Sequence, residues 1–246
     1  MDSLTIAAAS GLRSRMQSLD LLANNLANTA TSGYKRDQEY YGLFTSPDAD
    51  TDSGAGTATL PVIQGQWTDF SQGTLAATGN AMDVALNGKG FFVVNGSNGP
   101  LYTRNGNLQI LASGQLATAD GFVLQNTEGK PITVAPGKAI TISTDGTVQQ
   151  GTQTVGQLKV VNFPATASLE KVGATCFRNL NPKVLPAAAA GVEVQQGKLE
   201  GSNVPVAEAA MRLVGVMRQF EMLQKAVGIS SEMDSKTIQE VARVGS

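Results

Sequence analysis

Residues 206–244 read VAEAAMRLVGVMRQFEMLQKAVGISSEMDSKTIQEVARV, and this run sets the architecture that we expect for the whole chain. Positions spaced alternately by 3 and 4 form one stripe along it, as in an amphipathic helix or a coiled-coil seam. The stripe comprises Val206, Ala210, Leu213, Met217, Phe220, Gln224, Val227, Ser231, Asp234, Ile238 and Val241. A helix of about 40 residues would span roughly 60 Å, which is longer than a small β domain. We therefore expect this stripe to pair with another helix, in this chain or in a neighbouring subunit.

A second amphipathic run lies at the other end of the chain, from residue 3 to about residue 28. Its apolar stripe has spacings of 3, 4, 3, 4 and 3 and comprises Ala9, Leu12, Met16, Leu19, Ala23 and Leu26. Residues 28–33 (NTATSG) are turn formers and end this helix. Packing of both helices on the sheet of one globular domain is an alternative. Their length favours pairing as a coiled-coil-like layer.

The middle of the chain is expected to form β structure. Short runs of β-forming residues alternate there with turn dipeptides, of which the clearest are Asn95-Gly96, Asn105-Gly106, Asp120-Gly121 and Asp145-Gly146. This pattern predicts an antiparallel sandwich or an irregular barrel. The expected fold class is therefore mainly β with α-helical termini.

Three regions follow from these patterns. We expect residues 1–35 and 202–246 to form a discontinuous helical assembly domain, and residues 70–201 to form a β-rich domain. Residues 36–69 would be a linker and extended segment. Within it, residues 46–59 are nearly all small, polar or acidic, which is typical of a mobile loop.

The composition argues against an enzyme. The chain has no histidine, so the usual general base near neutral pH is missing, and its one cysteine, Cys176, excludes an internal disulfide and a multi-cysteine metal site. The net charge of -2, from 18 Lys and Arg against 20 Asp and Glu, offers no basic field for nucleic acid. No secretory signal or membrane-spanning run is readable in the sequence. We expect no catalytic residue, no cofactor and no metal.

Acidic residues offer two candidate sites, and both have a simpler interpretation. Asp48, Asp50 and Asp52 resemble the start of a calcium-binding loop, but Ser53 and Thr59 stand where such a loop needs Gly and Glu. A solvated linker is the favoured interpretation. A second set could meet as acid and base in a β domain, but each member lies near a turn signal, where Asp commonly caps turns; the set is Asp69, Asp83, Asp120, Glu128 and Asp145.

Several motifs resemble those of the flagellar rod and hook proteins, the bacterial axial family. The stretches ANNLAN (23–28) and TSGYKR (31–36) are similar to its N-terminal signature, carried here by Asn24, Asn25, Leu26, Ala27, Asn28, Gly33, Tyr34 and Lys35. The resemblance continues through FSQGTL (70–75), DVAL (83–86), GKGFFV (88–93), YTRNG (102–106) and GKLEGSNV (197–204). It covers nearly the whole chain.

The resemblance implies a structural subunit of the basal-body rod, which spans the periplasm. It implies export by the flagellar type III apparatus without a cleaved signal, no stable membrane insertion, and helical assembly with itself and other axial proteins. The terminal helices would form an inner layer, and the β domain would lie outside them. The amides of Asn24, Asn25 and Asn28 could fix the register at the helix end, although a simple helix stop is an equal interpretation.

Two alternatives to a proximal rod subunit are considered: another subunit of the same family, and a protein of another class. The compact stretch after Tyr41 favours a proximal rod subunit over a distal rod or hook subunit of the same family. A protein of another class, a secreted β-rich binding module, would need exposed aromatic residues. Few are available, chiefly Trp67 and the cluster of Tyr34, Tyr40 and Tyr41.

Overall fold

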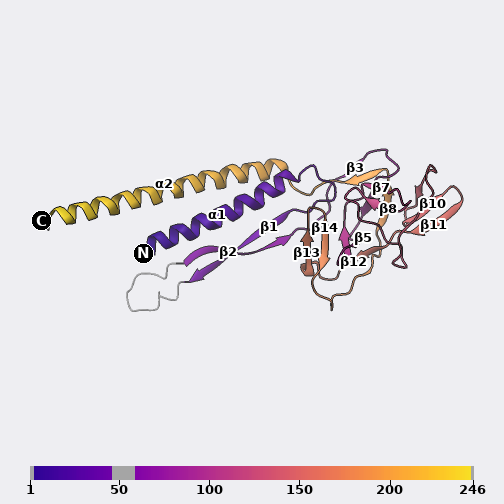
Figure 1. The fold of residues 1–246 in the computed structure, drawn as a ribbon, viewed down its shortest axis with the longest axis horizontal. Coiled ribbons are helices and arrows are strands. Elements are labelled where there is room, and N and C mark those ends of the chain that lie inside the picture. The colour runs from indigo at the N-terminus through magenta and orange to yellow at the C-terminus, as the bar shows by residue number, and fades with distance from the viewer. Residues whose placement is uncertain (1–2, 46–58, 245–246) are drawn as a thin grey trace. The chain divides into compact units, whose positions relative to one another are not determined.

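The computed structural model describes residues 3–45 and 59–244 of the 246-residue chain. Two long helices, α1 (Ser3–Ala27) and α2 (Val206–Val244), enclose a β-rich middle region in the sequence (Figure 1). The expectation of mainly β structure with helical termini is thereby confirmed. The predicted loop at residues 46–58, with Asp48, Asp50 and Asp52, lies outside the described residues.

The chain folds into two compact units. Unit 1 comprises residues 1–26, 37–67 and 205–246, and unit 2 comprises residues 27–36 and 68–204. Both units are therefore built from segments that are distant in the sequence. None of the described helices is apolar enough over a sufficient length to cross a membrane.

Unit 1 contains both helices and a two-stranded sheet of β1 (Asp37–Thr45) and β2 (Thr59–Thr68). The helices run in opposite directions, and α2 extends beyond the start of α1 (Figure 1). The two helices contact each other at Gly11 of α1 and Leu223 of α2: a Cβ added to Gly11 would lie 3.8 Å from Leu223 Cδ1. At the ends of α2, Glu208 in the first turn and Arg243 in the last complement the helix dipole.

Unit 2 holds fifteen of the described strands and one short helical turn. They are β3 (Leu75–Ala77), β4 (Val84–Asn87), β5 (Phe91–Gly96), β6 (Gly99–Thr103), β7 (Leu108–Ile110), β8 (Leu116–Thr118), β9 (Thr141–Ile142), β10 (Thr147–Gln150), β11 (Gln153–Gln157), β12 (Val160–Asn162), η2 (Thr166–Ser168), β13 (Leu169–Val172), β14 (Cys176–Asn179), β15 (Ala187–Ala188), β16 (Glu193–Gln196) and β17 (Lys198–Glu200).

The largest sheet of unit 2 has six strands in the order β13-β14-β6-β5-β12-β15, and its paired strands are antiparallel. Its two edge strands, β13 and β15, are different strands at opposite ends of the order, so the described strands do not close into a barrel. Two-stranded pairs join β16 to β4, β17 to β3 and β7 to β8, and a three-stranded sheet has the order β11-β10-β9.

The core of unit 2 lies on both faces of the central sheet. Along β5, Phe92 and Val94 belong to one buried apolar cluster, and Phe91 and Val93 belong to another. Successive side chains of a strand point to opposite faces, so the continuous run FFVV marks a strand that is buried on both sides. The second cluster is rich in aromatic rings, with edge-on contacts such as Tyr102 against Phe163 at 4.7 Å between ring centroids.

Three of the four predicted turn dipeptides adjoin turns. Asp120-Gly121 and Asp145-Gly146 place their glycines at φ of 86° and 83°, and Asn95-Gly96 ends β5 one residue before the hairpin turn. Asn105-Gly106 does not form a turn. It is a buried stretch in which a Cβ on Gly106 would lie only 1.6 Å from Val84 O, so glycine is needed for close backbone approach.

Candidate functional site

The buried face of α1 differs from the apolar stripe predicted for it. Leu12, Leu19 and Leu26 are half-buried, whereas Met16 is 54% exposed and Ala23 is exposed. The side chain of Ala9 lies outside the described ones. Among the described side chains of the helix, the buried ones are instead Ser14, Ser18, Leu21, Leu22 and Asn25.

Polar contacts to β1 explain this shift. The Ser18 hydroxyl donates a hydrogen bond to Glu39 Oε2 at 2.7 Å and lies 3.2 Å from the Tyr41 hydroxyl, which itself donates to Glu39 Oε1 at 2.5 Å. Partial burial, together with the Glu39 carboxylate, raises the pKa of Tyr41. A helix face that is buried through serines gives no apolar periodicity, so the spacing of apolar residues could not identify it.

Asn25 carries the most specific contact at the end of α1. Its Nδ2 donates to Asp37 O at 2.8 Å, and its Oδ1 accepts from Asp37 N at 3.0 Å. The amide thus pairs with both backbone groups of the first residue of β1, as a neighbouring strand would. Of the other two asparagines, Asn24 is exposed and Asn28 accepts a hydrogen bond from the Thr31 hydroxyl at 3.1 Å.

α2 has two apolar faces. Half-buried residues recur at spacings of 3, 4, 3 and 4, and this face comprises Leu213, Val216, Phe220, Leu223 and Val227. A second set of apolar side chains is 49% to 70% exposed and comprises Met211, Val214, Met222 and Ile229. Seven or eight residues complete two helical turns, so this second set shares one side of α2, roughly opposite the first.

The stripe predicted for α2 therefore coincides with the half-buried face only in part. Leu213, Phe220 and Val227 lie on that face, but Met217 is 47% exposed and its neighbour Val216 is half-buried instead. The side chains of Ile238 and Val241 lie outside the described ones. Because apolar residues line both faces, spacing alone did not determine which of two adjacent positions points toward α1.

A cluster of buried charges lies in unit 2, where the signature residue Lys35 meets two later segments of the chain. Lys35 Nζ lies 2.5 Å from Glu200 Oε1, and Arg104 Nη1 lies 3.1 Å from Glu200 Oε2. The side chains of Lys35 and Glu200 are 0% exposed and that of Arg104 is 3% exposed. We call these three residues the charge cluster.

Backbone groups complete the charge cluster. Lys35 Nζ donates to Ser71 O at 2.7 Å, and Arg104 Nη2 donates to Gly88 O at 2.6 Å. Burial lowers the pKa of Lys35 and of Arg104, although the Glu200 carboxylate opposes the shift in both. Burial outweighs the ion pairs because removing an ammonium or guanidinium group from water is costly and one carboxylate serves both cations.

The signature residues beside Lys35 are packed closely. Gly33 has φ of 72°, its N donates to Glu200 O at 2.7 Å, and a Cβ on it would lie 2.4 Å from Asn105 N. Tyr34 is 0% exposed, and Lys171 Nζ lies 4.2 Å from the centre of its ring. Only glycine at position 33 allows both the left-handed backbone and this approach.

Asn203 holds the same region from the C-terminal side. Its Oδ1 accepts from Arg36 N at 2.8 Å, and its Nδ2 donates to Asp69 O at 2.8 Å. Arg36 Nε in turn lies 3.0 Å from Asp69 Oδ2. Sequence reasoning named Lys35 as a signature residue but did not pair it with Arg104 and Glu200. No local pattern in the sequence indicates this pairing, because the three residues lie in separate segments of the chain.

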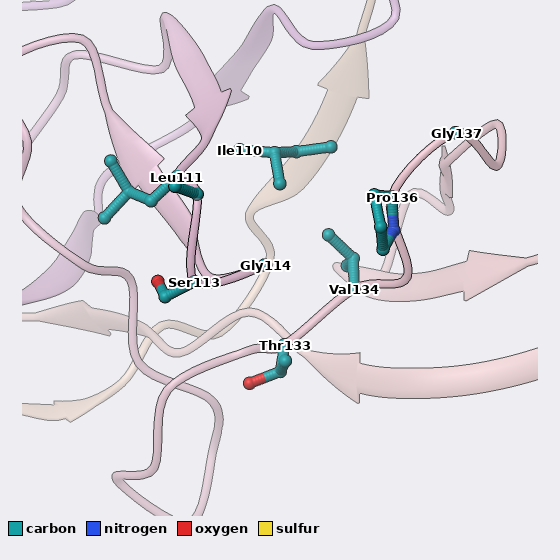
Figure 2. A pocket seen from close by; sticks show the side chains of 9 residues that line it. Ile110, Leu111, Ser113, Gly114, Thr133, Val134, Pro136 and Gly137 are labelled. Atoms are coloured by element: carbon teal, nitrogen blue, oxygen red, sulfur yellow. The ribbon is translucent and has the colours of Figure 1, made fainter.

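A pocket of about 540 Å³ lies beside the β7–β8 hairpin (Figure 2). Its lining residues are Ile110, Leu111, Ala112, Ser113, Gly114, Thr133, Val134, Pro136 and Gly137. None of these has an ionisable side chain, so the pocket offers no general acid or base.

Two family descriptions match the sequence. Residues 85–150 match the one described as Flagellar hook protein FlgE/F/G D1 domain, and residues 195–240 match Flagellar basal body rod FlgEFG protein C-terminal. The first match contains Arg104, and the second contains Glu200 and most of α2.

Curated relatives extend the similarity to nearly the full length. The flagellar basal-body rod protein FlgG of Buchnera aphidicola subsp. Baizongia pistaciae is 32% identical over 254 residues, covering 93% of this chain and 96% of the relative. FlgF of Salmonella typhimurium is 31% identical, covering 97% and 98%. FlgF of Caulobacter vibrioides is 28% identical, covering 99% and 100%. All three relatives are named as flagellar basal-body rod proteins. The chain belongs to the flagellar basal-body rod protein family and is a structural subunit of that rod.

Proposed function

We propose that this rod subunit is exported by the flagellar type III apparatus and assembles helically through its two terminal helices. Its partners would be further copies of itself and other axial proteins. The observation that carries this proposal is the second apolar face of α2, formed by Met211, Val214, Met222 and Ile229, which the folded chain leaves exposed.

The exposed face has the composition of a contact surface. Contiguous apolar side chains on the surface of a soluble protein commonly mark an interaction site. Two of its members are methionines, whose unbranched and polarisable side chains adapt to differently shaped partners. Such adaptability suits a subunit that would contact both its own kind and other axial proteins. A contact between two different surfaces also builds an open helical filament when its rotation does not close into a ring.

The opposite face supports coiled-coil-like pairing within the subunit. Leu213, Val216, Phe220, Leu223 and Val227 keep the alternating 3 and 4 spacing of a heptad seam, and Leu223 contacts α1 at Gly11. We infer that this seam holds the two helices together while the exposed face meets a neighbour. The helical assembly domain expected at residues 1–35 and 202–246 would act through α1 and α2 of unit 1, whereas residues 27–36 and 202–204 belong to unit 2.

The place of the subunit within the rod is a further part of the proposal. We infer the proximal type of rod subunit, over the distal type or the hook, from the compact stretch after Tyr41. The alignments with FlgG of Buchnera and FlgF of Salmonella have nearly equal lengths, 254 and 253 positions, and do not separate the types. The relatives bear both names, FlgF and FlgG.

Met222→Asp tests the assembly surface. The substitution puts a charge at a side chain that is 61% exposed, so the purified monomer should keep its circular dichroism and its melting temperature within about 2 °C. In the assembled rod the same carboxylate would be buried without a partner, which is costly. We expect cells that carry the variant to lack filaments and to be non-motile, as scored by electron microscopy and swimming in soft agar.

Gln224→Asp is the matched control, because it adds the same charge at an exposed position of α2 outside the exposed apolar face. It should leave motility near normal. Swimming cells with Met222→Asp would refute the assembly surface. Equal loss of motility in both variants would show that any charge on α2 is harmful and that this face has no special role.

A further inference from the structure

The charge cluster joins parts of the chain that are far apart in sequence. Lys35 lies in the segment that follows α1, Arg104 directly follows β6, and Glu200 is the last residue of β17. Glu200 therefore comes from the last strand of unit 2, whereas both cations come from segments that precede it. Lys35 and Glu200 are separated by 165 positions.

The charges of the cluster do not balance. Two cations and one carboxylate leave a net charge of +1 in a region that is closed to water. Arg104 Nε is buried with no hydrogen-bond partner in the part of the chain that the structure describes. The Asp69 carboxylate also favours the charged form of Lys35 and raises its pKa, but Asp69 forms its own ion pair with Arg36. Glu200 is thus the main counter-ion of both buried cations.

The segment that carries Glu200 is also held by its backbone. β17 pairs with β3 in the register Lys198↔Ala77 to Glu200↔Leu75, and Gly201 N donates to Thr74 O at 2.8 Å. Glu200 Oε1 accepts from Gly73 N at 2.9 Å. When this segment leaves, it takes away both the carboxylate and these hydrogen bonds, and it leaves two cations in the interior of unit 2.

We propose that Glu200 is an electrostatic latch, so that β17 cannot detach while the rest of unit 2 stays folded. A single buried cation without its partner is already strongly destabilising, and here two buried cations would lose their counter-ion at the same time. We therefore expect β17 to detach only when the interior of unit 2 opens, in one cooperative unfolding event. Unit 2 completes its fold only when the last strand is in place. This inference concerns the isolated chain and does not depend on export or assembly.

Native-state hydrogen exchange on the full-length protein, read by mass spectrometry, tests the latch. In the wild type, amides of β17 should exchange through the same opening as amides of β5 and β6, with equal rates and equal dependence on denaturant. Fast exchange of β17 while β5 and β6 remain protected would overturn the proposal.

Glu200→Gln removes the charge and keeps the shape. We expect exchange in β17, β5 and β6 to rise together by about 10²- to 10³-fold, the usual consequence of breaking a buried ion pair. The matched control is Glu193→Gln on β16, whose side chain is exposed and contacts Asn87 at 3.4 Å. It should change exchange by less than about 3-fold. Wild-type protection in Glu200→Gln would contradict the latch.

The variant Lys35→Met/Arg104→Met/Glu200→Gln removes all three charges. It tests the latch even if Glu200→Gln alone does not fold. If charge imbalance is the cause, this triple variant should fold, and its β17 should now detach separately from β5 and β6. A triple variant that is as unfolded as Glu200→Gln would show that shape, and not charge, holds the strand, and the latch would be wrong.

Discussion

The two units of this protein differ in which side chains they bury and which they leave exposed to water. Unit 2 buries even its charges: Lys35, Arg104 and Glu200 share an interior site, and apolar clusters fill both faces of its central sheet. Unit 1 leaves methionines and branched aliphatic side chains of α2 in contact with water. One unit is complete within a single chain, and the other has the composition of an element that neighbouring subunits complete.

The difference also separates stability from function. We expect the buried charge cluster to favour one arrangement of strands, because another arrangement would leave a buried charge without its partner. An exposed apolar face does little for the stability of the monomer, yet it provides a surface that association can bury. We therefore expect substitutions in unit 2 to act on folding and substitutions on α2 to act mainly on assembly. The following predictions test that division, starting with the largest effect.

Gly33→Ala should damage unit 2 most. The new Cβ would lie 2.4 Å from Asn105 N and would occupy a backbone at φ of 72°. We expect a loss of at least about 4 kcal/mol in the free energy of unfolding, measured by urea denaturation. Gly121→Ala is the control, because its φ of 86° is strained but no atom lies within 4 Å of the added Cβ. It should cost about 1 to 2 kcal/mol, and equal losses in both variants would mean that the close approach at Gly33 is unimportant.

Matched leucine truncations compare the two units directly. Leu86 is 0% exposed within the larger apolar cluster of unit 2, and Leu86→Ala should cost about 2 to 5 kcal/mol. Leu223 is half-buried beside α1, and Leu223→Ala should cost about 1 kcal/mol in the monomer. Thermal melts followed by circular dichroism at β-rich and helical wavelengths can measure both. A larger loss at Leu223 would show that the helix pair is a stable core by itself.

The Lys35 ammonium should make the stability of unit 2 vary with pH in the alkaline range. Burial lowers its pKa below 10.5 in the folded chain, against the combined effect of Glu200 and Asp69, while Arg104 adds to the lowering. The unfolded chain then binds more protons in the window just below 10.5, so stability should rise as the pH rises through it. Loss of that proton leaves Arg104 and Glu200 as a balanced pair.

Lys35→Met isolates this effect. The difference in unfolding free energy between wild type and Lys35→Met should move in favour of the wild type as the pH rises through the window just below 10.5. Urea denaturation at several pH values measures it. A difference that stays constant, or falls, would show that the proton on Lys35 is not penalised in the folded state.

The smallest effect concerns the Cys176 thiol. It is 2% exposed in the core of unit 2, and burial raises its pKa, so little thiolate is present near neutral pH. We expect no labelling of the native protein by a thiol reagent at pH 8 over minutes and complete labelling in denaturant. Rapid labelling of the native protein would reveal that unit 2 opens far more often than its packing indicates.

The sequence by itself determined the broad plan of this protein. Alternating 3 and 4 spacings identified both terminal helices, and short β-forming runs between turn dipeptides identified the β-rich middle, because spacing and turn residues are local properties. The motifs around Gly33 and Tyr34 identified the family. These signals needed no knowledge of which distant residues meet.

Tertiary structure alone decided which faces are buried. Ser18 and Asn25 are buried because β1 returns along α1 and offers Glu39 and the backbone of Asp37, and no periodicity of apolar residues reports such polar partners. On α2, apolar side chains occupy both faces, so only the position of α1 decides between Val216 and Met217. The charge cluster is the extreme case. Lys35 and Glu200 are 165 positions apart, and a charge in a sequence gives no sign of burial until the fold brings its counter-ion within 2.5 Å.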